Sequence, residues 1–413
     1  MADTVRPRDA KDVEAAVQWA LAEGKTVEIV GHGSKRAIGR PAQTDVTLDL
    51  STLTGVTLYE PEELVLSAKA GTPLAEIEAL LAANGQQLAF EPMDYAGILG
   101  GVGGRGTIGG ALAANVSGPR RIKAGAARDH FLGFSAASGR GETFKSGGRV
   151  VKNVTGYDLC KLIAGSWGTL AAMTEVTIKV LPRPETEHTL LILGLEPARA
   201  VEAMTFAMGS SCDVSGAAHL PAEVAGHIAA DETAGRAVTA LRLEGFSPSV
   251  AERTRTLEAL MKPFGELATA EAPRSRAFWT AVRDVTPFAA DRSNLSPRQD
   301  ERPLWRVSTA PSRGAELAAM IAKGAPAQTF YDWAGGLIWV ALGASDDADA
   351  ALVRRAVAAT GGHATLIRAP ASVRAAIDVF APQDAAVAAL TKRVKESFDP
   401  KGVLNPGRMW AGV

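Results

Sequence analysis

The sequence has only two cysteines, Cys160 and Cys212, and this scarcity excludes several kinds of site. Two thiols cannot ligate a four-cysteine iron–sulfur cluster or an all-cysteine zinc site. Their spacing is not that of a CxxC pair, and two residues cannot form a disulfide framework. The cysteine content therefore favours a reducing compartment.

Histidine is also scarce, and its spacing gives no support to a metal site. The six histidines never occur as HxH or HExxH, the spacings that place two imidazoles on one face of a strand or helix. We therefore expect no metal. The six are His32, His130, His188, His219, His227 and His363.

The chain lacks an excess of charge and a long apolar run. It has 44 Lys and Arg against 45 Asp and Glu, a formal net charge of -1, which argues against a nucleic-acid binder. No apolar run approaches 18 residues, so we expect no membrane span. Residues 1–16 are charged and have no apolar core, unlike a signal peptide. We expect a cytoplasmic protein that reaches a membrane only through partners.

Glycine, in contrast, is abundant, with 42 residues of 413, and it is concentrated in loops. The first glycine-rich segment, residues 31–39 (GHGSKRAIG), directly follows an expected strand at 26–30. Closely spaced glycines let backbone N–H groups converge on an anion. The segment alone fits either a pyrophosphate cradle or a glycine-rich turn.

The second segment, residues 100–115, contains a literal GxGxxG at Gly101, Gly103 and Gly106. We reject a dinucleotide-binding fold here, because that fingerprint needs a hydrophobic strand just before it. Instead we expect Thr107 to open a helix whose first-turn N–H groups face a phosphate. A flexible loop before an ordinary helix explains the same residues.

A third segment places TGYDL at 155–159 ahead of GSWGTL at 165–170, and a strand follows. Beyond it, the two prolines of residues 181–184 (LPRP) break regular structure and predict a domain boundary. After this boundary, expected strands alternate with alanine-rich helices over about 200 residues, which favours a second α+β or α/β layer.

Taken in order, these segments resemble the FAD-binding domain of the vanillyl-alcohol-oxidase / PCMH flavoprotein family. The terminal DPKGVLNPG at 399–407 and the third segment resemble its glycolate oxidase / D-lactate dehydrogenase branch. The resemblance implies an α+β fold with a two-part PCMH-type FAD-binding domain and an α/β cap. We expect the FAD domain at 1–182, the cap at 185–390, and a returning segment at 391–413.

The resemblance also implies which residues hold the cofactor. The covalent members attach flavin through a histidine in the first loop, but Gly33 precedes Ser34 here, so we expect non-covalent FAD. Carried over by position, the cofactor-binding residues are Gly31, His32, Gly33, Ser34, Lys35, Gly39, Pro92, Gly106, Thr107, Gly109, Gly110, Ala114, Asn115, Gly118, Gly168, Thr169, Met173 and Asn405.

A 2-hydroxy acid requires a cation for its carboxylate and a base for its hydroxyl proton. We select Arg105, beside the glycine cluster, and Arg306 in the cap as candidate cations, with Arg302 as a further one; each also fits a solvated arginine. Tyr157 is a candidate catalytic residue beside the flavin or a packed aromatic. The aromatic segment 330–339 fits a face toward flavin or a partner, or a pair of core strands.

Two hypotheses about function follow from the resemblance. In the first, this chain oxidises glycolate or a related 2-hydroxy acid and passes electrons through FAD to an iron–sulfur partner. In the second, it is a flavin-binding relay or scaffold, and turnover occurs on another flavoprotein subunit. Trp167 replaces an acid of the family pattern, which favours the second. The implied partners are the D-type flavoprotein and F-type iron–sulfur subunits of a glycolate oxidase.

Overall fold

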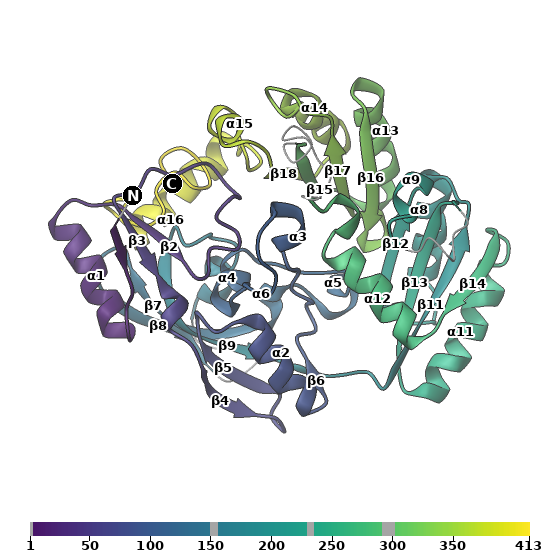
Figure 1. The fold of residues 1–413 in the computed structure, drawn as a ribbon, viewed down its shortest axis with the longest axis horizontal. Coiled ribbons are helices and arrows are strands. Elements are labelled where there is room, and N and C mark those ends of the chain that lie inside the picture. Colours follow the sequence, from purple (N-terminus) through teal and green to yellow (C-terminus); the bar gives the residue numbers. More distant parts are fainter. Residues whose placement is uncertain (1–2, 149–155, 229–234, 291–301) are drawn as a thin grey trace.

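The computed structural model describes residues 3–148, 156–228, 235–290 and 302–413. It has a mixed α+β architecture, which confirms the expected fold class. The N-terminal half builds two sheets, and a large separate sheet follows them along the chain (Figure 1). The C-terminal segment returns to lie beside the N-terminal half.

The first sheet contains three parallel strands in the order β1-β3-β2. Helix α1 (Ala10–Ala22) precedes β2, and the Asp9 side chain caps it by accepting from the N–H groups of Lys11 and Asp12. Its buried residues recur at helical spacing and pack in one cluster with the sheet. The strands are β1 (Asp3–Val5), β2 (Val27–Val30) and β3 (Val46–Asp49).

The second sheet has five antiparallel strands in the order β4-β5-β9-β7-β8. Short helices of the N-terminal half share a buried apolar cluster with it. The strands are β4 (Val56–Glu60), β5 (Val65–Lys69), β7 (Phe131–Ser138), β8 (Thr143–Gly147) and β9 (Ala171–Lys179). The helices in this cluster are α2 (Leu74–Ala83), α4 (Ile108–Ala113), α6 (Ala127–His130) and α7 (Leu159–Ile163), whereas α3 (Ala96–Leu99) and α5 (Arg121–Ala124) lie outside it.

The third sheet has eight strands in the order β14-β11-β13-β12-β16-β17-β15-β18, and we call this part the cap. Helices alternate with its strands along the sequence, yet every pairing is antiparallel. Two short strands, β6 (Gln86–Gln87) and β10 (Leu181–Pro182), pair at the crossing into the cap. The cap strands are β11 (Thr186–Leu193), β12 (Gly216–Leu220), β13 (Val238–Gly245), β14 (Glu266–Ala270), β15 (Leu304–Ser308), β16 (Ala327–Asp332), β17 (Leu337–Leu342) and β18 (His363–Arg368).

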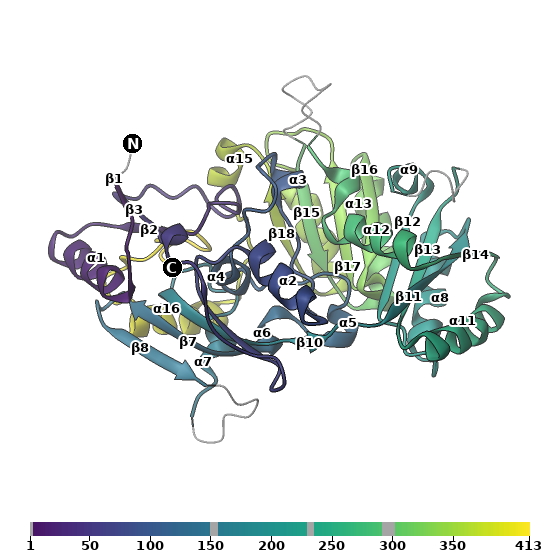
Figure 2. The same ribbon diagram turned by 60° about the horizontal axis from the view of Figure 1, so that its bottom comes forward.

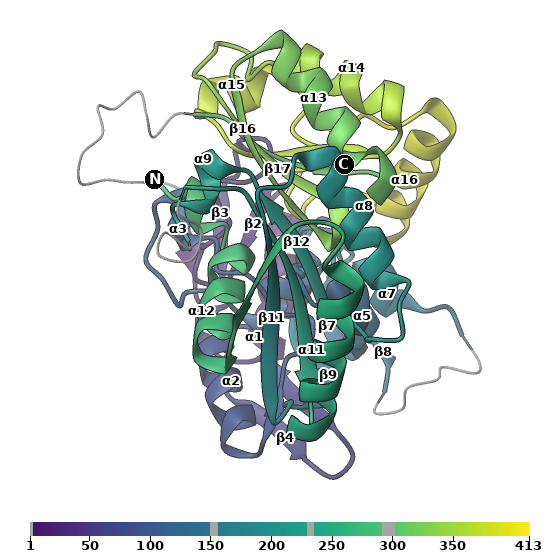
Figure 3. The same ribbon diagram turned by 90° about the vertical axis from the view of Figure 1, so that its right-hand side faces the viewer.

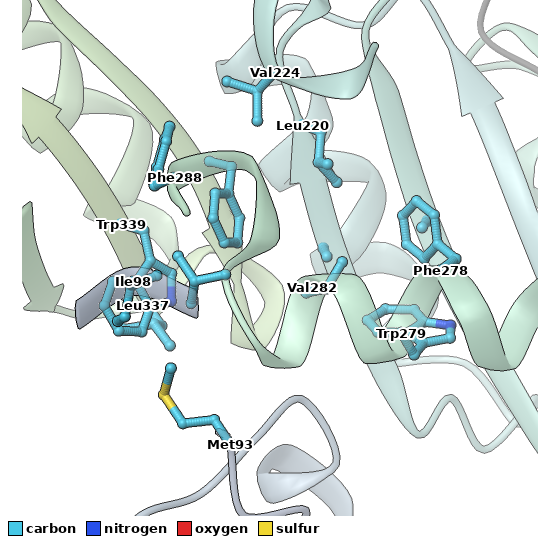
Figure 4. Packing of buried hydrophobic residues seen from close by; sticks show 14 of the residues in the cluster. Met93, Ile98, Leu220, Val224, Phe278, Trp279, Val282, Phe288, Leu337 and Trp339 are labelled. Carbon is cyan, nitrogen blue, oxygen red and sulfur yellow. The ribbon is translucent and has the colours of Figure 1, made fainter. Parts of the chain in front are cut away.

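Helices cover both faces of the cap sheet (Figure 3). Buried residues of α8, α11, α13 and α14 pack on its outer face. The inner face meets α12 together with residues of the N-terminal half, and Figure 4 shows Met93 and Ile98 near Leu337 and Trp339. One apolar cluster therefore joins the two halves of the molecule. The helices are α8 (Pro197–Met208), α9 (Ala222–Ala225), α11 (Ser247–Met261), α12 (Ala272–Arg283), α13 (Gly314–Gly324), α14 (Ala350–Thr360) and α15 (Ala371–Ala376).

The last helix, α16 (Ala385–Phe398), lies beside β8 (Figure 2). The ring of its Phe398 packs against that of Phe144 in β8, with the two centroids 5.8 Å apart. After the helix, the N–H of Val27 in β2 donates to the carbonyl of Val403 at 2.8 Å. The chain end is thus built into the N-terminal half. Within the described residues, no helix combines the length and apolar character needed to span a bilayer.

Several elements differ from the sequence-based expectation. Strands β12 and β14 and helix α12 were not expected, because their short or mixed polar patterns resemble loops. The pair Thr72-Pro73 is typical of an N-cap followed by the first residue of a helix, and it predicts that Thr72 caps the helix that follows. Instead Pro73 occupies the cap position, and the Thr72 hydroxyl donates to the carbonyl of Lys69 at 2.7 Å.

Candidate cofactor site and domain interface

The three glycine-rich segments meet around one cavity. It lies where β2 ends, where α4 begins, and where the chain enters β9. Residues 31–35 form one wall, the start of α4 forms another, and residues 167–173 form a third. The segments are far apart in the sequence, and the fold brings them to one place.

The first loop presents unpaired hydrogen-bond donors to this cavity. Within the described part of the chain, the backbone N–H groups of residues 32–35 have no hydrogen-bond partner. A buried N–H without a partner is costly, so such a group of donors indicates an anion or polar ligand. The imidazole Nε2 of His32 is likewise buried in the cavity wall and unpartnered in the described structure.

Two cations lie in the cavity wall without a carboxylate that neutralises them closely. Burial lowers the pKa of Lys35 to about 8, although Asp94 acts against the shift. Burial also lowers the pKa of Arg408 to about 10, against the attraction of Glu28, whose nearest oxygen is 3.8 Å away. Both shifts show positive charge that the protein itself does not fully compensate.

The start of α4 differs from the expectation in an informative way. The Thr107 side chain caps the helix, as expected, and accepts from the N–H of Gly110 at 3.2 Å. However, the N–H groups of Ile108 and Gly109 donate to the carbonyls of Thr72 and Ala70 at 3.0 and 2.9 Å. The expectation of free first-turn donors was therefore wrong, because the loop after β5 already pairs with them.

Glycine is required in these walls for close packing. A Cβ built at Gly31 would lie 2.7 Å from the Thr107 hydroxyl, and one at Gly109 would lie 2.7 Å from the Cβ of Ala70. Neither position admits a side chain without movement of its neighbours. The loop, α4 and the β5 end thus approach one another closely, and this contact shapes the cavity.

The third wall carries Trp167, whose backbone has a positive φ of 54°. Its N–H donates to the carbonyl of Ala113 at 2.9 Å, and its carbonyl accepts from the side chain of Asn405 at 2.7 Å. The Asn405 side chain also accepts from the N–H of Ile29 at 2.8 Å, so this amide joins the third wall to the strand before the first loop.

The cavity brings together eleven of the residues that sequence reasoning selected for the cofactor. These are Gly31, His32, Gly33, Ser34, Lys35, Thr107, Gly109, Gly110, Ala114, Gly168 and Met173. The other seven lie outside the cavity lining: Gly39, Pro92, Gly106, Asn115, Gly118, Thr169 and Asn405. Of these, Gly39 contacts the wall residue Arg408, whereas the carbonyl of Gly118 accepts from the indole of Trp333 in the cap.

The three candidate catalytic residues are not brought together. Arg105 is exposed, and Tyr157 is 91% exposed; neither lines the cavity. Thr155 of the same motif lies outside the described residues. Arg306, in contrast, projects from the inner face of the cap sheet, where its guanidinium lies 4.9 Å from the ring centre of Trp333. Of the candidate cations, it is the one at the domain interface.

Sequence reasoning missed several lining residues because they are ordinary in sequence. Leu50, Ala70 and Arg408 come from three separate segments, and only the fold shows that they face the same cavity. Arg408 follows directly after the terminal DPKGVLNPG segment, which was the available signal. Cys160 is buried, and burial raises the pKa of its thiol to about 12, so it behaves as a small apolar residue.

These walls fit the diphosphate of FAD. The fit rests on the unpaired N–H groups of the first loop, the orphaned His32 nitrogen and the uncompensated charge of Lys35. The residue directly before Ser34 is Gly33, which has no side chain to attach a flavin. The residues present are compatible with non-covalent binding.

Comparison with known proteins agrees with this geometry. A family model described as an FAD binding domain matches residues 2–147. Glycolate oxidase subunit GlcE from Escherichia coli (strain K12) is 33% identical over 396 residues, covering 96% of this chain and 95% of the relative. Glycolate oxidase subunit GlcD from Bacillus subtilis (strain 168) is 44% identical over 87 residues, 21% of this chain and 18% of that protein.

The fold also matches solved structures. A crystal structure of p-cresol methylhydroxylase with substrate bound has a TM-score of 0.71 and covers 98% of this chain and 88% of its own, at 13% identity. At that identity the likeness concerns the fold alone. The chain is an FAD-binding oxidoreductase, and it belongs to the GlcE family of glycolate oxidase subunits.

Proposed function

We propose that this chain is the FAD-binding subunit of a glycolate oxidase (glycolate dehydrogenase) complex. It oxidises glycolate or a related 2-hydroxy acid to the 2-oxo acid and passes the electrons through flavin to an iron–sulfur partner. The observation that carries the proposal is the position of Arg306. Within the described residues its guanidinium makes no ion pair or hydrogen bond, and it lies at the domain interface against the ring of Trp333.

Tyr95 connects this arginine to the cavity. Its buried ring lies 5.9 Å from the Nζ of Lys35, which lines the cavity. Burial raises the pKa of Tyr95, and the charge of Arg306 opposes that shift, so the two groups are within electrostatic reach. A carboxylate bound at Arg306 would therefore sit next to the cofactor site.

FAD, when bound, accepts the two electrons of the oxidation. The protein must hold the substrate carboxylate and accept its hydroxyl proton. Asp332 is the proposed proton acceptor. Burial raises the pKa of Asp332 to about 7. The N–H of Trp333, which donates to its Oδ1 at 2.7 Å, acts in the opposite direction. Such a carboxyl exchanges a proton near neutral pH, and Arg306 is close enough to act on it electrostatically.

The electrons require a carrier outside this chain, because its two cysteines cannot ligate a four-cysteine cluster. We propose a D-type flavoprotein and an F-type iron–sulfur protein as partner subunits. The whole-chain similarity to GlcE and the local similarity to GlcD support this choice. We further propose that the chain works in the cytoplasm and meets a membrane only through these partners.

The alternative is a flavin-containing relay or scaffold, with turnover on a paralogous flavoprotein. Trp167 favours it, because its indole lines the cavity at the position where the family pattern has an acid. The placement of Arg105 and Tyr157 outside the cavity favours it too.

Steady-state oxidation of glycolate by the purified, FAD-loaded chain with an artificial acceptor separates these two functions. Turnover well above the buffer rate contradicts the scaffold function. An FAD-loaded chain that is inactive alone but becomes essential when the partner subunits are added contradicts independent catalysis.

A further inference from the structure

A second arginine lies against the same indole as Arg306. The guanidinium carbon of Arg121, in α5 of the FAD-binding half, lies 4.3 Å from the ring centre of Trp333, and that of Arg306 lies 4.9 Å from it. The two cations come from opposite sides of the domain interface, one from each half of the molecule. The indole is their common support, through cation–π contact with each.

Neither guanidinium has a close partner of opposite charge among the described residues. Within the described residues, the side chains of Arg121 and Arg306 make no ion pair and no hydrogen bond. Burial lowers the pKa of both arginines. The charge of Arg121 lowers the pKa of Arg306 further, and both charges lower the pKa of His363. Both remain partly open to solvent, while Trp333 and Tyr95 are buried. The site therefore combines positive charge with partial exposure to solvent.

The neighbouring arginines show that this lack of compensation is local. Arg120, next in sequence, binds Glu244 at 2.7 Å and Glu91 at 3.1 Å. Arg242 binds Glu91 at 2.9 Å. Each of these two cations has a carboxylate within ion-pair distance. Among the described residues Arg121 and Arg306 have none so close, and Asp129 and Asp332 act on them only from a greater distance. Half-buried cations without partners are expensive unless an anion joins them.

The indole is held in place independently of the arginines. Its Nε1 donates to the carbonyl of Gly118 at 3.0 Å, and this carbonyl lies three residues before Arg121. Trp333 and Ala334 both have positive φ, 52° and 57°, which is a strained state for residues other than glycine. Strain of this kind persists only where the surroundings impose it, so the position of the Trp333 indole is fixed before any ligand binds.

We propose that Arg121 and Arg306 together bind the carboxylate of a small 2-hydroxy acid, with Arg121 as a second, specificity-determining residue. This inference rests on the proposed function and names the substrate-binding groups of the same site. A planar guanidinium stacked on an aromatic ring keeps its N–H edge free for bidentate contact with a carboxylate. Two such edges from the two halves would make binding depend on the assembled interface.

The test is a titration of the FAD-loaded full chain with glycolate, and separately with oxalate as a dianionic probe. Binding is measured by calorimetry and by the perturbation of flavin absorbance. We expect Arg121→Gln to weaken glycolate binding by roughly 10- to 100-fold, the range for loss of a charge-assisted hydrogen bond. Arg121→Lys should recover part of the loss, because it restores charge but not the planar edge.

The matched control is Arg128→Gln, a nearby exposed arginine that lies outside the proposed site. It should bind glycolate as the wild type does. FAD content and the thermal midpoint of each variant show that folding is intact. The inference is overturned if Arg121→Gln binds both ligands as tightly as wild type, or if the wild type binds neither.

The same titration distinguishes the inference from the proposed function. Glycolate binding that depends on Arg121 but never reduces the flavin supports the two-arginine site and contradicts oxidation by this chain. Flavin reduction by glycolate that is unchanged in Arg121→Gln, with unchanged affinity, supports the proposed function and overturns the inference. A preference for oxalate that disappears in Arg121→Gln supports the site and shows that it selects dianions.

Discussion

The guanidinium of Arg242 in cap strand β13 donates to both carboxylate oxygens of Glu91 in the FAD-binding half, at 2.9 and 3.0 Å. Arg120 and Glu244 extend this pair into a four-residue cluster, with Arg120 bound to Glu244 at 2.7 Å. Arg242 is 1% exposed, so its charge depends on these partners and not on water. The cluster links the cap to the N-terminal half through buried ion pairs.

We predict that Arg242→Met destabilises the protein strongly. Removal of one member of a buried pair leaves Glu91 with less compensation, which typically costs about 3–5 kcal/mol. The exposed Arg255, paired with Glu252 on the surface, is the matched control, and Arg255→Met should change the free energy of unfolding little. Denaturant unfolding measures both variants. Equal stability of the two would contradict a structural role for the cluster.

The same cluster predicts a loss of stability in acid. Burial alone would raise the pKa of Glu244, but Arg242 and Arg120 outweigh it and hold the pKa at about 2; the pKa of Glu91 is lowered for the same reason. A glutamate in the unfolded chain has a pKa of about 4.3. Stabilisation by these carboxylates is therefore complete above that value and is lost as pH falls toward about 2. Unfolding free energies measured between pH 6 and 2.5 should fall less steeply in Glu244→Gln than in wild type.

FAD affinity should depend on Lys35 and on pH. A diphosphate beside the buried ammonium stabilises its charged form, so binding should raise its pKa from about 8. Affinity should then decrease as pH rises above about 8, because the free protein has lost the proton that the complex retains. Lys35→Met should bind FAD roughly 10- to 100-fold more weakly at pH 7 and lose this pH dependence. Fluorescence titration with FAD measures both effects, and a pH-independent affinity in wild type would count against the assignment.

A buried lysine holds the third cavity wall to the chain end. Lys395 donates to Asp399 at 2.6 Å and to the carbonyls of Thr169 and Leu404 at 2.6 and 2.8 Å. Lys395→Met leaves Asp399 buried without its cation, so we expect a loss of about 3–5 kcal/mol of stability. The exposed Lys392 on the same helix provides the control, Lys392→Met. FAD binding and urea unfolding should both worsen in the first variant, whereas unchanged behaviour would show that the wall is held in another way.

Much of the fold followed from local patterns. Asp9 and Thr107, both of residue types that favour the N-cap position, cap their helices, because an N-cap acts within three residues of itself. Helix α8 begins at Pro197, as a proline in the first turn predicts. Thr72 shows the limit of such reasoning, since its hydroxyl pairs with Lys69 and Gly55 in a turn that the sequence pattern does not reveal.

The site was predicted less completely, because it depends on contacts between segments that are far apart in the sequence. The glycine segments were recognisable because backbone approach demands small residues. The hydrogen bonds at the start of α4 were not recognisable, because its N–H groups donate to the carbonyls of residues 70 and 72 in a neighbouring segment. Arg121 looks like any surface arginine in sequence; only its meeting with Trp333, more than 200 residues away, makes it a candidate ligand.

The central claim is that this chain binds FAD and that a 2-hydroxy acid reduces it. The most direct measurement is the visible spectrum of the purified chain, recorded before and after acid precipitation, and again after anaerobic addition of glycolate. The account predicts flavin bands that move to the supernatant on precipitation and bleach with glycolate. A chain that reconstitutes with FAD but keeps its full absorbance in glycolate would contradict oxidation by this subunit, and a chain that takes up no FAD would contradict the cofactor site itself.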